Sequence, residues 1–334
     1  MRAAVYHGQG RISVEQVPDP TARDGEIVIA MRACGLCGSD LMTWYQDPRA
    51  PTVLGHEPVG EVVLAGEGAG FEPGERVFVH HHVPCFACRL CRMGRHTLCA
   101  MFRETRIDPG GLAERIRVPA PNVRADVLRV PDGMSDRAAT LIEPLGCVVH
   151  GLRLAHVGPG SLVAVVGSGA MGLLQIQAAR ALGAERVVAI EPRPERRVLA
   201  EAAGALALDD ASPDAVGKTL GGRLADAVLV CTANRQAIAD ALHLAGPAGV
   251  VQLFAPTPPG EIVGLDLGAI FFGEVELQST YSAGPTDTRD ALQMLERGAV
   301  DAEALISHEV PLARVEEAFR LARTGEALKV VVVP

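Results

Sequence analysis

Hydrophobic positions along the chain follow two patterns, and the change between them divides the sequence into three parts. Up to about residue 150, short apolar runs are separated by glycine, proline and aspartate, which is typical of β-strands joined by turns. The strands expected in this part are Ala3–Tyr6, Ile27–Ala33, Val59–Leu64, Arg76–Val79 and Ala113–Val118. From about 151 to 285, apolar runs alternate with helical periodicity, which predicts a parallel sheet covered by helices.

The middle part predicts a doubly wound α/β sheet. Its expected strands are Leu162–Val166, Arg186–Ile190, Ala227–Val230 and Val250–Phe254. The helical stretches between them are Ala170–Leu182, Pro194–Ala203 and Gln236–Ala245. After residue 285, helices at Asp287–Arg297 and Leu312–Arg323 precede a strand at Lys329–Val333. We therefore expect a β-rich domain over 1–150, a parallel-sheet domain over 151–285, and a C-terminal segment, 286–334. The boundary near 150 carries no linker composition.

Composition narrows the functional classes. The chain has 334 residues, 48% of them hydrophobic, so two domains can each bury a core. The net charge of −9 argues against nucleic acid as a partner, because phosphate binding needs a basic face. No stretch approaches the roughly 20 apolar residues of a membrane span. The opening MRAAVYHGQG lacks the apolar core of a signal peptide, so a cytoplasmic location is expected.

Four of the eight cysteines lie in one short run, Cys85, Cys88, Cys91 and Cys99. Four thiolates at this spacing can surround one zinc ion and leave no position for substrate, which predicts a structural site over 80–100. An iron–sulfur cluster is the alternative, because such motifs also open with C-x2-C-x2-C. Here the fourth cysteine follows after seven residues rather than three, and Ala100 stands where those motifs have proline, which favours zinc.

A glycine-rich motif follows the first strand of the middle part and opens a helical stretch. Gly167 permits a tight turn, Gly169 lets a pyrophosphate approach the backbone, and Gly172 lets helix and strand pack closely. With the intervening Ala170 and Met171, this segment predicts a dinucleotide site at a helix N-terminus.

An acidic residue after the next strand favours NAD over NADP. Glu191 lies 19 residues beyond Gly172, where a carboxylate hydrogen-bonds the ribose hydroxyls and repels a 2′-phosphate. Arg196 and its neighbours Arg193 and Arg197 leave the alternative open, because arginines there could hold that phosphate.

Three separated segments carry further metal-ligand types: Cys34-Gly-Leu-Cys37-Gly-Ser-Asp40, Gly55-His56-Glu57 and Glu143-Pro144-Leu145-Gly146. Together they have the composition of a catalytic zinc site with an open position. Spacing alone does not join them, because His56 could be a hydrogen-bonded core residue and Glu143 could simply lie at a helix end.

These motifs resemble those of the zinc-dependent medium-chain dehydrogenase/reductase superfamily, in the same order and over essentially the whole chain. CGLCGSD, GHEPVGEV, the four-cysteine run, PGGLAERIRVP and VVGSGAMG all match. The resemblance implies a GroES-like catalytic domain joined to a Rossmann NAD-binding domain. EPLG at 143–146 looks like the sorbitol and threonine dehydrogenase branch, because typical alcohol dehydrogenases have cysteine near that position.

The resemblance also implies roles for individual residues. Cys37 and His56 match zinc ligands, and Glu57 and Glu143 match two carboxylates that bind zinc directly or through water in different members. Ser39 matches the hydroxyl that takes the proton of the substrate alcohol.

Two further positions bear on that site. Asp40 matches an acid that orients the ligand histidine. Most relatives have a proton-relay histidine where this chain has Met42, so the route of the proton to solvent stays open.

Substrate residues are less constrained. Trp44, His82 and Arg103 are the candidates, and His82 matches a histidine that lines the threonine dehydrogenase site. It belongs to the triplet His80–His81–His82, in which at least one ring is expected to face solvent.

The motifs leave three functions to compare. Aromatic residues make up 4% of the chain, which favours a polar substrate and a polyol dehydrogenase that interconverts a secondary alcohol and its ketone. L-threonine 3-dehydrogenase is the alternative, supported by His82 and opposed by Met42. A non-catalytic NAD-binding sensor is disfavoured because the catalytic zinc set is complete. The resemblance implies two zinc ions per chain and a homo-oligomer, tetramer or dimer, with Val275–Thr280 as a candidate edge strand.

Overall fold

The computed structural model describes all residues, 1–334, and the chain divides into two compact units. Unit 1 comprises Met1–Pro144, Ala283–Glu296 and Ala302–Pro334, and unit 2 comprises Leu145–Ser282 and Arg297–Asp301. The first boundary falls inside helix α6 (Ile142–Leu154). Because the chain crosses this boundary as a continuous helix, the sequence carries no linker there.

Unit 1 is built on two sheets. A seven-stranded sheet has the order β15-β16-β3-β5-β6-β8 with β7 also paired to β3, and a three-stranded sheet has the order β2-β1-β4. The strands are β1 (Arg2–Gly8), β2 (Arg11–Gln16), β3 (Ile27–Gly35), β4 (Thr52–Val53), β5 (Glu57–Ala65), β6 (Arg76–Val79), β7 (Arg115–Val118), β8 (Val127–Arg129), β15 (Ile306–Pro311) and β16 (Lys329–Val333). Strand β3 pairs antiparallel with both β5 and β16, so distant parts of the sequence meet at its end.

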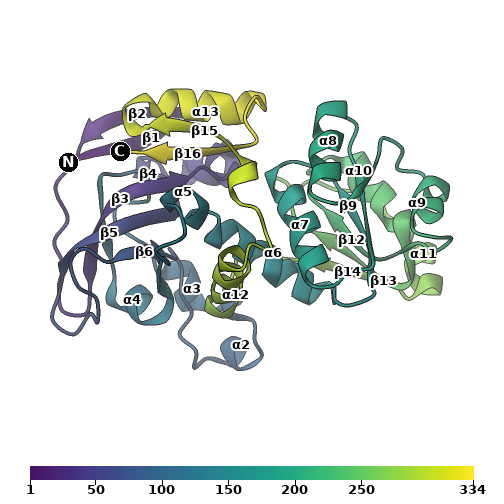
Figure 1. The fold of residues 1–334 in the computed structure, drawn as a ribbon, viewed down its shortest axis with the longest axis horizontal. Helices are drawn as coiled ribbons and strands as arrows, with labels where there is room; N and C mark the ends of the chain where they lie inside the picture. Colours follow the sequence, from purple (N-terminus) through teal and green to yellow (C-terminus); the bar gives the residue numbers. More distant parts are fainter. The chain divides into compact units, whose positions relative to one another are not determined.

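Short helices and two longer ones complete unit 1. They are α1 (Thr43–Gln46), α2 (Arg89–Arg92), α3 (Ala100–Glu104), α4 (Ala120–Asp126), α5 (Asp136–Ala139), α12 (Pro285–Glu296) and α13 (Val315–Thr324). Helix α13 lies along β15 and β16 (Figure 1) and buries Val315, Ala318, Phe319 and Leu321 against them. Helix α2 belongs to the segment 85–104, here called the cysteine lobe, which projects away from the main sheet of unit 1 (Figure 1).

Unit 2 is a six-stranded parallel sheet of order β11-β10-β9-β12-β13-β14. Its strands are β9 (Leu162–Val166), β10 (Arg186–Ile190), β11 (Leu206–Leu208), β12 (Ala225–Val230), β13 (Ala245–Leu253) and β14 (Glu276–Ser279). Its helices, besides α6, are α7 (Ala170–Ala181), α8 (Pro194–Ala202), α9 (Pro213–Thr219), α10 (Arg235–Ala241) and α11 (Leu267–Gly273). Every residue of β9 is buried, because α7 covers one face of the sheet while α9 and α11 lie on the opposite side (Figure 1).

The order of the parallel strands reverses at β9. The next strand in sequence, β10, lies on one side of it, and β12 lies on the other. In open parallel sheets, ligands bind beyond the carboxyl ends of the strands at such a switch point. The glycine-rich motif at 167–172 follows β9 directly, so the fold brings it to this point.

The expected strands and helices of the middle part form with ends shifted by a few residues at most, and the proposed edge segment contains β14 at the end of the sheet. Strands β2, β4, β8, β11 and β15 were not expected. None of the helices is both long and apolar enough to cross a membrane.

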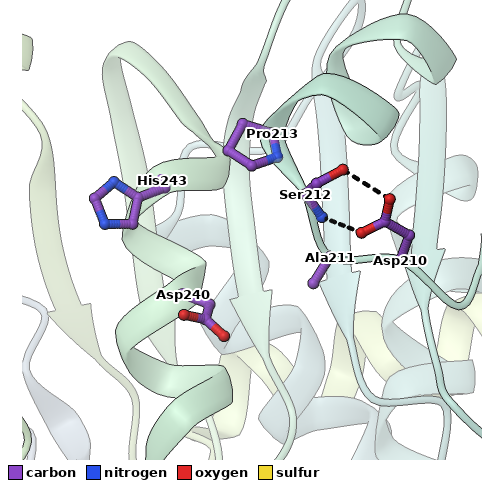
Figure 2. Close-up of a pocket in the computed structure, with 6 residues that line it drawn as sticks. All are labelled: Asp210, Ala211, Ser212, Pro213, Asp240 and His243. Carbon is purple, nitrogen blue, oxygen red and sulfur yellow. Dashed lines mark hydrogen bonds between the residues drawn. The ribbon is translucent and has the colours of Figure 1, made fainter.

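A pocket of about 390 Å³ lies in unit 2 and is lined by Asp210, Ala211, Ser212, Pro213, Asp240 and His243. Figure 2 shows the side chains of Asp240 and His243 on one wall and the turn before α9 on the other. The Asp210 carboxylate accepts hydrogen bonds from the backbone and the hydroxyl of Ser212 (Figure 2). None of the residues expected to bind metal or cofactor lines this pocket.

Candidate active site

Three of the expected zinc ligands gather in unit 1 where β3 ends and β5 begins. Cys37 follows β3, and His56 and Glu57 stand at the start of β5, its antiparallel neighbour. One ligand atom from each of the three lies within 4.8 Å of the others. Strand pairing therefore joins segments that sequence spacing alone could not connect.

Asp40 fixes the orientation of His56. Its carboxylate is buried and accepts hydrogen bonds from the backbone nitrogens of Cys37 at 3.0 Å and Gly55 at 3.5 Å. It also lies 3.5 Å from Nδ1 of His56, so Nε2 is the ring nitrogen that stays available to a metal ion.

Negative charge surrounds the histidine. Burial lowers the pKa of His56, but the charges of Asp40 and Cys37 outweigh burial and raise it well above its usual value. Burial also raises the pKa of Asp40, yet the charge of His56 and its hydrogen bonds lower it overall. The site is thus electrostatically prepared for a cation.

Glu57 is fully buried and is paired with Lys329, the first residue of β16. The lysine Nζ lies 2.5 Å from Glu57 Oε2 and also donates to the Leu36 carbonyl at 3.1 Å. Burial lowers the pKa of Lys329, but the charges of Glu57 and Cys37 outweigh it, so the ammonium stays protonated. Gly35 makes room for the carboxylate, because a Cβ there would lie 1.9 Å from Glu57 Oε2.

Lys329 was not among the residues expected at the site. The sequence feature that could have indicated it is the rarity of lysine, because only Lys218 and Lys329 among the 31 lysine and arginine residues are lysines. A lysine retained in an arginine-rich chain indicates a position where a compact ammonium fits and a guanidinium does not.

The donor set fits zinc. A thiolate, an imidazole and a carboxylate are the ligands of catalytic zinc sites, and three protein ligands leave a fourth position open. The second oxygen of Glu57, Oε1, is buried without a hydrogen-bond partner, which a cation would satisfy.

Glu143 falls in a different group. It is buried in the first turn of α6, and its ligand atom lies within 4.8 Å of those of His80 and His81. The His81 ring also lies beside His56, with ring centroids 4.9 Å apart. His80 and His81 were not among the expected site residues.

The histidine triplet corrects one expectation. His80 and His82 are buried and His81 is half-buried, so no ring of the triplet is fully exposed. His82 Nδ1 lies 2.6 Å from the Thr105 carbonyl oxygen, and its ring packs against Phe102. Phe102 and Thr105, which follow the cysteine run, contact His82, and the sequence gives no sign of that contact.

The other expected side chains differ in exposure. Ser39 is half-buried in the turn that carries Cys37, and its carbonyl accepts a hydrogen bond from the buried Gln46 at 2.9 Å. Met42 is half-buried directly after this turn. Trp44 on α1 and Arg103 on α3 are exposed.

The cysteine lobe brings Cys85, Cys88, Cys91 and Cys99 together. The sulfur of Cys91 lies 3.9 Å from that of Cys85 and 3.6 Å from that of Cys88, and Cys85 and Cys99 are 3.6 Å apart. Four sulfurs about 2.3 Å from a central zinc ion stand about 3.8 Å apart. The observed sulfur–sulfur separations match that tetrahedron.

The thiols of the lobe also differ in acidity. Hydrogen bonds from the backbone of Ala87 and Cys88 lower the pKa of Cys85 to about 6, whereas burial and neighbouring thiols raise that of Cys91 to about 12. All four can ionise together only around a cation.

The glycine-rich turn has the geometry of a phosphate site. Gly167 adopts a φ of +95°, and a Cβ on Gly172 would lie 1.9 Å from the Gly167 carbonyl oxygen. A Cβ on Gly169 would meet nothing within 4 Å. The turn therefore leaves open space in front of the N-terminus of α7, where Gly169, Ala170 and Met171 present backbone N–H groups.

Glu191 is buried beside this turn. Its Oε2 accepts a hydrogen bond from the Ser168 backbone at 2.8 Å, and its Oε1 accepts one from the Arg193 backbone at 3.0 Å. Arg197 donates to backbone carbonyls at 2.9 Å, whereas Arg196 is half-buried on α8.

Comparison with known proteins identifies both halves of the chain. Residues 23–132 match the alcohol dehydrogenase GroES-like domain, and residues 170–297 match the zinc-binding dehydrogenase family. Sorbitol dehydrogenase of Halalkalibacterium halodurans is 30% identical over 349 aligned residues, covering 100% of this chain and 99% of that protein. L-threonine 3-dehydrogenase of Bacillus velezensis is 30% identical over 335 aligned residues, which cover 96% of this chain and 95% of that protein. The solved structure of a putative zinc-binding dehydrogenase from Sinorhizobium meliloti 1021, bound to NADP, superposes with a TM-score of 0.88 at 30% identity. The match covers 100% of this chain and 99% of that chain.

Proposed function

The chain belongs to the zinc-dependent medium-chain dehydrogenase/reductase family, and on this premise we propose that it is an NAD-linked polyol dehydrogenase. It would interconvert a secondary alcohol and its ketone. The observation that carries the proposal is the convergence of Cys37, His56 and Glu57 around one point, with Asp40 behind the histidine. The similarity to sorbitol dehydrogenase supports a polyol as the substrate.

Each residue of the site has a defined task. Zinc held by Cys37, His56 and Glu57 supplies a Lewis acid that lowers the pKa of an alcohol, and NAD supplies the hydride acceptor. Oxidation removes a proton from the hydroxyl group and a hydride from the carbon atom. Ser39 receives the proton, because its hydroxyl stands in the turn that carries Cys37 and its backbone is fixed by Gln46.

The lysine pair keeps the third ligand in place. Burial raises the pKa of Glu57, and the charge of Lys329 opposes that rise. The lysine also fixes one carboxylate oxygen, which leaves the other to bind the metal. Asp40 keeps the lone pair of His56 Nε2 available by engaging Nδ1. Both contacts position ligands without touching substrate.

A second zinc ion is proposed in the cysteine lobe. Its four thiolates fill the coordination shell, so this ion would be structural. Together with the catalytic set, this makes two zinc ions per chain.

NAD is proposed as the cofactor rather than NADP. The buried Glu191 carboxylate is held at the end of β10 by two backbone N–H groups, and each of its oxygens retains a lone pair for a ribose hydroxyl. A 2′-phosphate would add two negative charges beside it. The NADP-bound relative and Arg196 favour the opposite choice. Glu191→Ala should reduce kcat/KM for NAD by about 10-fold or more and thereby reduce the ratio of kcat/KM for NAD to that for NADP.

The function is tested by NAD reduction on the zinc-loaded protein with a panel of polyols and L-threonine. Activity on polyols that Cys37→Ala abolishes, while NAD binding is kept, supports the proposal. Activity on L-threonine alone supports the second candidate, L-threonine 3-dehydrogenase, which the similarity to that enzyme favours. Full turnover by Cys37→Ala would overturn both.

We also propose that the protein forms a homo-oligomer through the edge of unit 2. Strand β14 ends the sheet, and α11 just before it exposes Leu267, Phe271 and Phe272. Light scattering of the intact protein and of Phe272→Asp tests this, and a monomeric wild type would refute it.

A further inference from the structure

A second group of candidate ligands lies in unit 1 around His80, the first residue after β6. Its Nδ1 lies 2.8 Å from Asp126 Oδ2, and both side chains are fully buried. Thr288 on α12 donates its hydroxyl to the same carboxylate, at 2.8 and 2.9 Å from the two oxygens. The carboxylate therefore fixes the tautomer, with the proton on Nδ1 and a lone pair on Nε2.

That lone pair has no partner. His80 Nε2 is buried without a hydrogen bond, and so is Nδ1 of the adjacent His81. Asn122 donates from one amide nitrogen to the carbonyls of both histidines, at 3.0 and 3.1 Å, which fixes their backbone. Buried ring nitrogens without a hydrogen-bond partner are costly unless something occupies the space between them.

Glu143 completes the group. Ligand atoms of His80, His81 and Glu143 all lie within 4.8 Å of one another, and Glu143 is buried. Ligands about 2.1 Å from an ion can stand at most about 4.2 Å apart, so the three can close on one ion by side-chain movements of less than about 1 Å.

We propose that His80, His81 and Glu143 form a third metal site in the chain, which binds a divalent transition-metal ion beside the Cys37–His56–Glu57 set. Two imidazoles and one carboxylate are a donor set that zinc and iron(II) sites use. The Asp126–His80 pair has the arrangement in which a carboxylate orients a metal-ligating histidine. The site is separate from the four-cysteine lobe and needs no thiolate.

The proposal is tested by metal counting on the intact protein, saturated with Zn²⁺ and then desalted. His81→Ala is the informative variant, because His80→Ala would leave the buried Asp126 without its partner and could unfold the unit. His82→Gln is the matched control, since His82 belongs to the same triplet but not to the ligand group. Cys37→Ser removes a ligand of the proposed catalytic zinc ion but none of the His80–His81–Glu143 group. Its zinc count therefore tests the proposed function separately from the site proposed here.

We expect about three zinc ions per chain in the wild type and in His82→Gln. We expect about two in Cys37→Ser, two in His81→Ala, and one in the double variant Cys37→Ser/His81→Ala. Loading with Co²⁺ gives a second readout, because only thiolate-bound Co²⁺ has an intense near-ultraviolet charge-transfer band. The ion lost in His81→Ala should leave that band unchanged.

Two results would overturn the proposal. One is a zinc count that His81→Ala leaves unchanged in both the wild-type and the Cys37→Ser backgrounds, which would mean that water alone satisfies the two histidines. The other is a loss of the thiolate band in His81→Ala, which would mean that His81 only supports the Cys37 set. A Cys37→Ser protein that keeps the wild-type count would instead contradict the proposed catalytic zinc set.

Discussion

Replacing Lys329 with methionine tests the electrostatics of the site most directly. At a separation of 2.5 Å and an effective dielectric constant of about 20, the attraction between Lys329 and Glu57 is roughly 6 to 7 kcal/mol. In the variant, Glu57 can avoid that loss by taking up a proton. At pH 7, protonation of a carboxyl whose unfolded pKa is about 4.3 costs about 3.7 kcal/mol. We therefore expect Lys329→Met to lose about 3 to 4 kcal/mol of unfolding free energy.

The same reasoning fixes a pH dependence. Burial already raises the pKa of Glu57 in the wild type, and loss of the Lys329 charge raises it further. Above the unfolded pKa, the folded variant therefore holds one more proton than the unfolded chain. Its stability then falls by about 1.4 kcal/mol for each unit of rising pH above about 4.3. The loss relative to wild type should shrink to about 1 kcal/mol at pH 5.

The assay is urea unfolding at pH 5, 6 and 7 without added zinc. Trp44 is the only tryptophan and lies in unit 1, so its fluorescence reports the unit that holds the ion pair. Glu57→Gln/Lys329→Met is the control, and it should recover most of the loss and show no added pH dependence. A single variant within 1 kcal/mol of wild type at pH 7, or a loss that grows toward pH 5, would refute the reasoning.

Three further substitutions probe other parts of the molecule. Gly169→Ala should keep the wild-type Tm, because its Cβ enters open space before α7, but that space is where NAD would bind, so calorimetry should show NAD binding weakened at least about 10-fold. Gly172→Ala should instead lower the Tm, because its Cβ collides with the carbonyl oxygen of Gly167. Cys99→Ser should remove about one zinc ion by elemental analysis and make the cysteine lobe sensitive to protease; unchanged metal content would contradict a four-cysteine site. Asp40→Asn should weaken catalytic zinc binding about 10- to 100-fold in competition with a chelating dye, and equal affinity would exclude a positioning role.

The parallel sheet was the most predictable part of the fold. Strands such as β9 and β10 are buried on both faces and read as continuous apolar runs, so hydrophobicity alone marks them. Strands such as β2 and β8 lie half-exposed and carry charged residues, and only pairing with a neighbour defines them. Tertiary context decided these segments.

The site was predictable where one motif carries it and less so where strand pairing assembles it. The cysteine lobe and the glycine-rich turn are local, so spacing described them. Lys329 reaches Glu57 only because β16 pairs with β3, and the sequence distance between them hides that contact. Glu143 was expected near Cys37 from resemblance alone. In the structure its ligand atom lies within 4.8 Å of those of His80 and His81, a proximity that the sequence does not indicate.

The interleaved segments of unit 1 set an order for folding during synthesis. Strand β3 leaves the ribosome early, but its partner β16 is made only after the whole 145–282 segment of unit 2. About 294 residues separate the end of β3 from the start of β16, so at about 5 to 20 residues per second the delay is roughly 15 to 60 s. Throughout that interval, the Cys34–Gly35 end of β3 lacks its β16 partner, although β7 can already pair with Ile27–Ala30, and Glu57 has no counter-ion. Unit 2, whose main segment is continuous, can fold first, so the nascent N-terminal region is the part of this protein most exposed to aggregation and most dependent on chaperones.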